Sequence, residues 1–165
     1  MDAVSKTSLL GVCNLLMATL FALSTYFQFD DSGCLIFFSD WYFWIPLYAT
    51  AFVVNLVNWS KPNSRMRKMA KFAFWLGVFL FIKVSIEDFV KGTDGFWSTD
   101  MKERIVREKF GSGLVIISMF LFLQNSSNPN SHPNQVTKYG MPILVGIAYG
   151  LSFVFFAFQH HEMKY

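Results

Sequence analysis

The chain has 165 residues, of which 53% are hydrophobic and only 15% are charged. This length suits one domain, and soluble domains of such size carry nearer a quarter charged residues, so the composition excludes an ordinary soluble fold. The formal net charge is +3, and no Lys/Arg run interleaved with aromatic residues predicts binding to nucleic acid. We therefore expect one polytopic membrane domain over residues 1–165, rich in the 20 Phe side chains that suit lipid contact.

The first half of the chain contains two predicted spans, since a transmembrane helix needs about 20 mostly apolar residues. The first covers residues 7–29 and has no charged residue. Lys6 followed by an apolar run imitates a signal peptide, but the run is long enough to span, so we predict a retained helix. The second covers residues 41–60 and has Trp near both ends, where indole rings prefer the membrane interface.

A basic loop is predicted after the second span. The stretch KPNSRMRKMAK, residues 61–71, holds five positive residues and no acid. Under the positive-inside rule this loop is cytoplasmic, and so is the N terminus. The sequons at Asn58 and Asn125 fall on the same side, and glycosylation of either would invert this orientation.

The third predicted span, residues 72–90, is uncharged only as far as Ile82. Eleven residues of helix cover about 16 Å, which is too short for the hydrocarbon core, so the span has to include charged residues. Lys83 and Glu87 are four positions apart on one helical face, and Asp88 is adjacent. Three interpretations stay open: an ion pair at the membrane edge, an intramembrane polar site, and an ion or proton path.

The last two spans are predicted at residues 110–124 and 139–158. An amphipathic helix, MKERIVREKF, precedes the fourth span and carries opposite charges at i,i+4 spacing. Because the fourth span is short, we expect this helix to continue into it; a position on the membrane surface is the alternative. A polar loop with two prolines follows this span. In the fifth span Gly146 and Gly150 form a GxxxG pair, which allows another helix to pack closely.

Two stretches, CNLLMATLFALSTYFQFDD (residues 13–31) and REKFGSGLVIISMFLFLQNSSNP (residues 107–129), resemble the transmembrane protein 220 family. The family pattern has Asn, Met-Ala and Phe-Ala-Leu before Gln and Asn-Asp, and later Arg-Glu followed by Gly-Leu-Val-Ile-Ile. This chain departs from the pattern at Asp30, where the family usually has Asn, and it lacks the Pro that follows. The resemblance implies a small polytopic membrane protein and no particular activity.

The polar residues near the ends of three predicted spans are the candidate site. In a five-span layout they share one side of the bilayer, and Asp31 can pair with Arg107; separate solvated helix ends are the alternative. Because both family motifs fall at these places, we favour a shared cluster that binds lipid head groups or a partner. Its candidate members are Gln28, Asp30, Asp31, Lys83, Glu87, Asp88, Arg107 and Glu108.

No motif for a metal, a cofactor or catalysis is present. His160, His161 and Glu162 lack further Cys or His ligands at a spacing that completes a tetrahedral set. The chain also lacks a Gly-rich phosphate loop and a nucleophile elbow. Cys13 and Cys34 lie in or near apolar runs, which argues against a disulfide, although Cys34 suits palmitoylation.

The sequence therefore predicts an all-α bundle of five transmembrane helices with an amphipathic helix before the fourth. We expect no enzyme, no catalytic residue and no cofactor. The predicted function is a non-catalytic accessory or scaffold subunit of a larger assembly, at the endoplasmic reticulum or another endomembrane, with lipids and membrane proteins as partners. The alternative is a small transporter or lipid-handling protein that uses the polar cluster.

Overall fold

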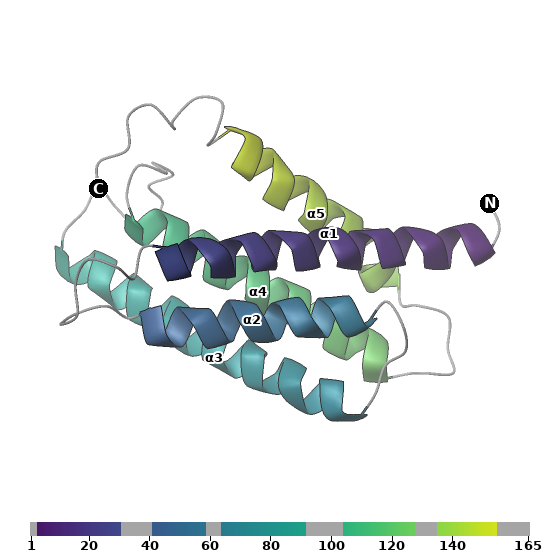
Figure 1. Cartoon of the computed structure of the whole chain (residues 1–165), viewed down its shortest axis with the longest axis horizontal. Helices are drawn as coiled ribbons and strands as arrows, with labels where there is room; N and C mark the ends of the chain where they lie inside the picture. Colours follow the sequence, from purple (N-terminus) through teal and green to yellow (C-terminus); the bar gives the residue numbers. More distant parts are fainter. Residues whose placement is uncertain (1–2, 31–40, 59–63, 92–103, 128–134, 155–165) are drawn as a thin grey trace.

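The computed structural model describes residues 3–30, 41–58, 64–91, 104–127 and 135–154, and every one of these segments is helical (Figure 1). The helices are α1 (Ala3–Asp30), α2 (Trp41–Asn58), α3 (Ser64–Lys91), α4 (Arg104–Ser127) and α5 (Gln135–Val154). The described part of the chain contains no strand. The predicted all-α architecture with five main helices is confirmed.

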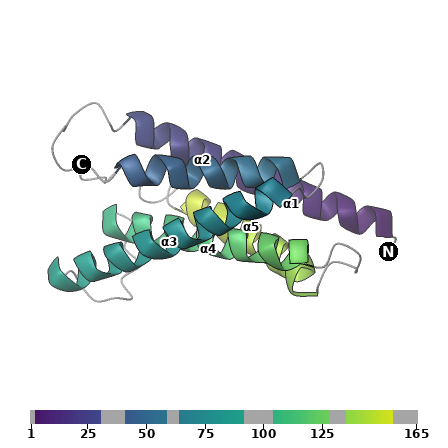
Figure 2. The ribbon, with the colours of Figure 1, turned by 90° about the horizontal axis from the view of Figure 1, so that it is seen from below.

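Consecutive helices run in opposite directions (Figure 1). Figure 2 shows two layers, one made by α1 and α2, and the other by α3, α4 and α5. Helix α1 packs mainly on α2 and α3 mainly on α4, while α5 crosses the bundle obliquely against α4 and α1.

This alternation gives the bundle two distinct ends. At one end α1 and α3 finish and α2 and α4 begin; we call it the α3–α4 end. At the other end α2 and α4 finish and α3 and α5 begin; we call it the α2–α3 end.

The core lies where the two layers meet. Its largest fully buried side chains are apolar and come from α1, α2, α3 and α4: Phe21, Trp44, Leu47, Leu80 and Met119. Gly77 lets α3 approach α4, because an added Cβ would lie 3.1 Å from Cγ1 of Ile116. The absence of a side chain at this glycine therefore sets how closely α3 packs on α4 within their layer.

Several helix boundaries differ from the prediction. Helix α3 begins at Ser64, so most of the predicted basic loop is helical. The physical reason is local propensity, since Arg, Met, Lys and Ala are strong helix formers and no Gly or Pro interrupts residues 64–71. The amphipathic segment continues into the fourth apolar segment as one helix from Arg104, as expected from the short fourth span, whereas the extension of α4 to Ser127, into the predicted polar loop, was not expected.

Parts of some predictions lie outside the described residues: residues 31–40, residues 101–103 of the amphipathic segment and the end of the fifth predicted span. The same holds for Cys34 and for His160, His161 and Glu162.

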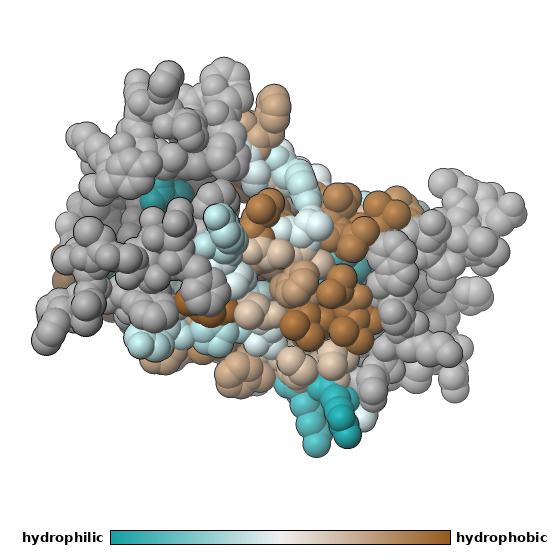
Figure 3. All heavy atoms as spheres, viewed as in Figure 1, coloured by the Kyte–Doolittle hydropathy of each residue, from teal (hydrophilic) through white to brown (hydrophobic). Residues whose placement is uncertain are grey.

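Two of the described helices are long and apolar enough to cross a membrane. These are α1, through Leu9–Tyr26, and α3, through Ser64–Val90. Helix α2 contributes a shorter apolar segment, Tyr42–Val57. Figure 3 shows apolar side chains across the middle of one face, with hydrophilic atoms projecting where α3 begins. The arrangement has the polarity of a membrane protein, with apolar flanks and polar ends.

Candidate functional site

Six charged side chains of α3 and α4 lie toward the α3–α4 end. The last turns of α3 contribute Lys83, Glu87 and Asp88, and the first turns of α4 contribute Arg107, Glu108 and Lys109. We call these six residues the charge cluster. Positive and negative groups are equal in number, so the cluster is neutral as a whole.

The central contact of the cluster is an ion pair between Lys109 and Asp88, in which Lys109 Nζ donates to Asp88 Oδ2. The side chains are only 13% and 8% exposed, respectively. A carboxylate this deep in an apolar bundle is costly unless an opposite charge contacts it. The pair therefore joins α3 to α4 where both helices approach the surface.

Sequence reasoning found Asp88 but missed its partner. Lys109 is 21 positions away, on another helix, and the predicted pairing concerned Lys83 with Glu87 on the same helix. Local i,i+4 spacing cannot reveal a contact between helices; only the antiparallel packing of α3 on α4 does. Lys83, Glu87, Arg107 and Glu108 also take part in polar or electrostatic interactions.

The structure places the other predicted members only in part. Gln28 and Asp30 belong to the last turn of α1, which ends at the α3–α4 end. Their side chains, and Asp31 altogether, lie outside the described residues. The predicted Asp31–Arg107 pair therefore stays a prediction.

A buried aromatic stack lies beside the charge cluster. The ring of Tyr48 stacks on Trp44, with centroids 5.9 Å apart, and on Phe21, with centroids 6.3 Å apart. Its hydroxyl presses on the backbone of Gly111, where an added Cβ would overlap Oη and lie 3.1 Å from Cζ. Glu108 is within electrostatic reach of the same hydroxyl. This glycine is therefore what lets α4 accept Tyr48.

Two helical turns further along, α2 and α4 share a buried hydrogen bond. Ser118 Oγ donates to Asn55 Oδ1 over 3.2 Å, and the Asn55 amide nitrogen donates to the carbonyl oxygen of Ala51 over 2.8 Å. Asn55 and Ser118 are 63 positions apart in the sequence, and so are Tyr48 and Gly111. Helices α2 and α4 thus run parallel and meet in one constant register. An Asn within an apolar span is the signal that sequence reasoning overlooked.

Helix α5 is connected to α1 by a different polar link. Tyr149 Oη and Thr19 Oγ1 are hydrogen-bonded over 2.8 Å, and Oη donates to the carbonyl oxygen of Leu16 over 2.9 Å. Hydroxyls elsewhere donate to carbonyls of their own helix, as Ser24, Thr25, Ser85 and Ser152 do. Such bonds satisfy a hydroxyl where water is absent.

The predicted packing glycines of α5 face outward. Gly146 and Gly150 are exposed, and an added Cβ at either would meet no heavy atom within 4 Å. Close approach between described helices occurs instead at Gly77, Gly111 and Gly140. The GxxxG pair therefore makes no contact within this chain's described part, and its use by another helix stays a prediction.

No three His, Cys, Asp or Glu side chains of the described residues come together as a possible metal site. Cys13 is a buried free thiol in α1. Among the polar contacts described above, Lys109–Asp88, Ser118–Asn55 and Tyr149–Thr19 join one helix to another.

These features define the class of protein. An all-helical bundle with apolar flanks, two helices long enough to span a bilayer and polar contacts between its helices is a membrane protein. The chain belongs to the family described as "Transmembrane family 220, helix", whose model matches residues 20–124. The match runs from the middle of α1 to the last turns of α4, and it confirms the resemblance noted from the sequence. No curated protein and no solved structure matches the chain.

Proposed function

We propose that this chain is a five-span membrane protein that acts as a non-catalytic accessory or scaffold subunit of a larger membrane assembly. The observation that carries this proposal is an uncovered row of large apolar side chains on α3. We call it the outer stripe; its members are Phe72, Trp75, Phe79, Ile82, Ile86 and Phe89, all exposed.

The outer stripe has the spacing of a helix-packing seam. Its members follow one another at alternating steps of three and four residues, which aligns them along one side of a helix. The opposite side of α3, with Ala73, Leu80 and Val84, is buried against the rest of the bundle. A helix that is apolar on both sides needs lipid or another helix against its free side. In the proposed function, the outer stripe is the surface through which this subunit contacts a helix of the larger assembly.

The helix lengths support five spans. The shortest, α2, has 18 residues and a length of about 27 Å, and α5 has 20 residues and a length of about 30 Å. These values match a hydrocarbon core of about 27–30 Å, and the thinner limit is that of the endoplasmic reticulum. We therefore favour an endoplasmic-reticulum or related membrane.

The distribution of charge supports a cytoplasmic N terminus. Among described side chains, the α2–α3 end has five basic groups and no acidic one, whereas the charge cluster at the other end is neutral. The basic groups are Arg65, Arg67, Lys68, Lys71 and Lys138. By the positive-inside rule the α2–α3 end faces the cytoplasm, and α1 begins there.

The orientation is tested with the sequon at Asn58, the last residue of α2. We expect no glycosidase-sensitive shift on a gel from the expressed full chain, and a shift that disappears in Asn58→Gln would reverse the orientation. Asn125 is a poorer reporter because it lies within α4 and lines a small cavity between helices.

The subunit proposal is tested by purifying the tagged full chain in mild detergent and quantifying what accompanies it. We expect a partner at fixed stoichiometry. In the triple variant Trp75→Ala, Phe79→Ala, Ile82→Ala the amount of co-purified partner should fall at least about tenfold, which corresponds to about 1.4 kcal/mol of binding free energy. The matched control is an α5 variant with Val136→Ala, Ile143→Ala and Ile147→Ala, which are also exposed. An inert monomer without a stoichiometric partner contradicts the proposal, and loss only in the control assigns the partner to α5.

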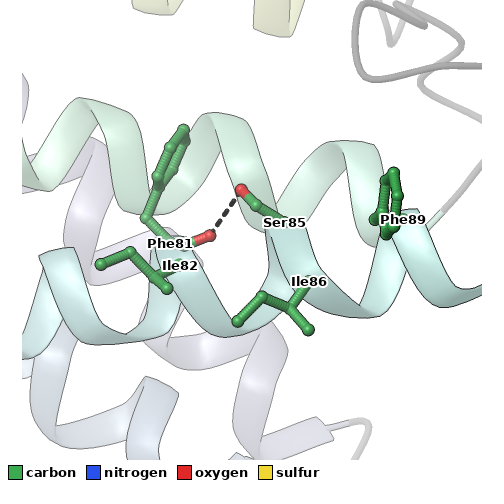
Figure 4. Close-up of a pocket in the computed structure, with 5 residues that line it drawn as sticks. All are labelled: Phe81, Ile82, Ser85, Ile86 and Phe89. Carbon is green, nitrogen blue, oxygen red and sulfur yellow. Dashed lines mark hydrogen bonds between the residues drawn. The ribbon is translucent and has the colours of Figure 1, made fainter.

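The second candidate is a small lipid-handling or transport protein, and one observation favours it. A shallow apolar groove of about 390 Å³ lies along α3 at Phe81, Ile82, Ser85, Ile86 and Phe89, in the same turns as three residues of the charge cluster (Figure 4). An acyl chain there would place its head group near those charges. Lipid scrambling or transport by pure protein in liposomes, lost when Lys83→Leu is combined with Glu87→Leu, would favour this candidate.

A further inference from the structure

A small, partly open cavity lies between α1, α4 and α5, toward the α2–α3 end. It has a volume of about 20 Å³, and its polar lining comes from Asn14 of α1, Asn125 of α4 and Thr137 of α5. Apolar residues complete the wall, among them Leu10, Phe122 and Met141.

Two of the lining side chains each have a buried oxygen atom with no hydrogen-bond partner. They are Oδ1 of Asn14 and Oγ1 of Thr137, whose residues are 6% and 3% exposed. A buried oxygen without a hydrogen bond costs free energy, so native interiors satisfy such atoms with protein or with ordered water. Here the two residues belong to different helices and line the same cavity.

The size and charge of the cavity select the ligand. A cavity volume of about 10–15 Å³ or more accommodates one water molecule. The described polar lining consists of two amides and one hydroxyl, and no charged side chain is among the described residues that line the cavity to balance a cation. Water can donate one hydrogen to Oδ1 of Asn14 and exchange a second bond with the Thr137 hydroxyl.

We propose that the cavity binds one ordered water molecule, which links α5 to α1 and α4. The water satisfies both unpaired oxygens and has Asn125 as a third neighbour. Tyr149 makes the direct link from α5 to α1 twelve residues beyond Thr137, about 18 Å along the helix. The obliquely packed α5 is thus held by a water-mediated contact in its first turns and by a direct one near its end. This site does not depend on the proposed subunit function.

Hydroxyl-radical footprinting by X-ray radiolysis tests the proposal on the full chain in lipid nanodiscs. A bound water generates radicals beside it, and Met141 of the cavity wall is only 2% exposed and is readily oxidised. Met119, at 0% exposed, is a core methionine away from the cavity and is the internal control. We expect Met141 to be oxidised at least about five times faster than Met119; equal protection of both overturns the proposal.

The variant that combines Asn14→Leu with Thr137→Val removes both oxygens, and in it we expect Met141 oxidation to fall to the level of Met119. An unchanged rate of Met141 oxidation means that bulk solvent reaches this residue, and this result overturns the proposal of a bound water. The single variant Thr137→Val gives an independent result in thermal unfolding. With water bound, the melting temperature falls by a few degrees; a rise means that the hydroxyl faces a dry cavity.

A monovalent cation is distinguished from water by its concentration dependence. We expect the same melting temperature in sodium, potassium and choline chloride at equal ionic strength. If the melting temperature rises with the sodium concentration alone, and only in the protein that keeps Asn14 and Thr137, the site binds an ion and the water assignment is overturned.

Discussion

The two ends of the bundle differ in the buried polar groups that they contain. At the α3–α4 end the buried groups include a charged pair, Asp88 and Lys109, which contact each other directly. At the α2–α3 end the described charged side chains are exposed or half-exposed, and the buried groups are neutral amides and hydroxyls with two unpaired oxygens. An unpaired charge in an apolar bundle costs several kcal/mol, whereas an unpaired neutral oxygen costs about 1–3 kcal/mol. In the part of the chain that the structure describes, the buried carboxylate thus lies where the chain itself supplies an opposite charge.

The largest expected effect comes from breaking the buried ion pair. Asp88→Leu removes the carboxylate that Lys109 contacts, and we expect the free energy of unfolding in detergent to fall by about 3 kcal/mol. Lys109→Leu should cost a similar amount, because it removes the ammonium group that Asp88 contacts. The double variant should lose much less than the sum of the two, since both single variants remove the same contact.

The matched control for the ion pair is Lys68→Leu at the opposite end, where the side chain is exposed. We expect its unfolding midpoint to stay unchanged. If Lys68→Leu destabilises the protein as much as Lys109→Leu does, the two ends do not differ in the way described here.

The next effect concerns the contact between Tyr48 and Gly111. A methyl group at Gly111 overlaps the buried hydroxyl, so Gly111→Ala should cost about 2 kcal/mol of unfolding free energy. Adding Tyr48→Phe should recover part of this loss, because the overlapping atom is removed. Gly113→Ala is the control, since an added Cβ there meets nothing within 4 Å, and it should gain up to about 1 kcal/mol through helix propensity. Equal losses at both glycines would contradict the close contact.

The smallest effect is expected midway between the ends. Ser118→Ala removes the donor to Asn55, and we expect a loss of about 0.6 kcal/mol, the average for such bonds in membrane bundles. Ser112→Ala serves as control, because that hydroxyl donates to the carbonyls of Glu108 and Lys109 in its own helix. A loss at Ser118 as large as that of Asp88→Leu would place the main polar contact at the centre of the bundle.

The helical architecture was predictable because it follows from local information. Long apolar runs, interface Trp residues and turn-forming stretches predict five helices, and local propensity explains why α3 begins as early as Ser64. The contacts of the candidate site depend on packing between helices. Glu87 and Asp88 are adjacent in sequence, yet only Asp88 is buried against α4, where it pairs with Lys109, and nothing near Lys109 in the sequence marks it as that partner. Thr137 and Asn14 line one cavity only because α5 crosses obliquely.

The shared register of α2 and α4 has a mechanical consequence. Tyr48 fits only where α4 has a glycine, and Asn55 needs the hydroxyl of Ser118; the two contacts are seven residues apart on each helix. A slide of one turn, about 5.4 Å, would press the tyrosine onto Val115 and move the amide beside Phe122, so both contacts would be lost together. Together the two contacts oppose sliding of α2 along α4 and hold this pair of helices in one register.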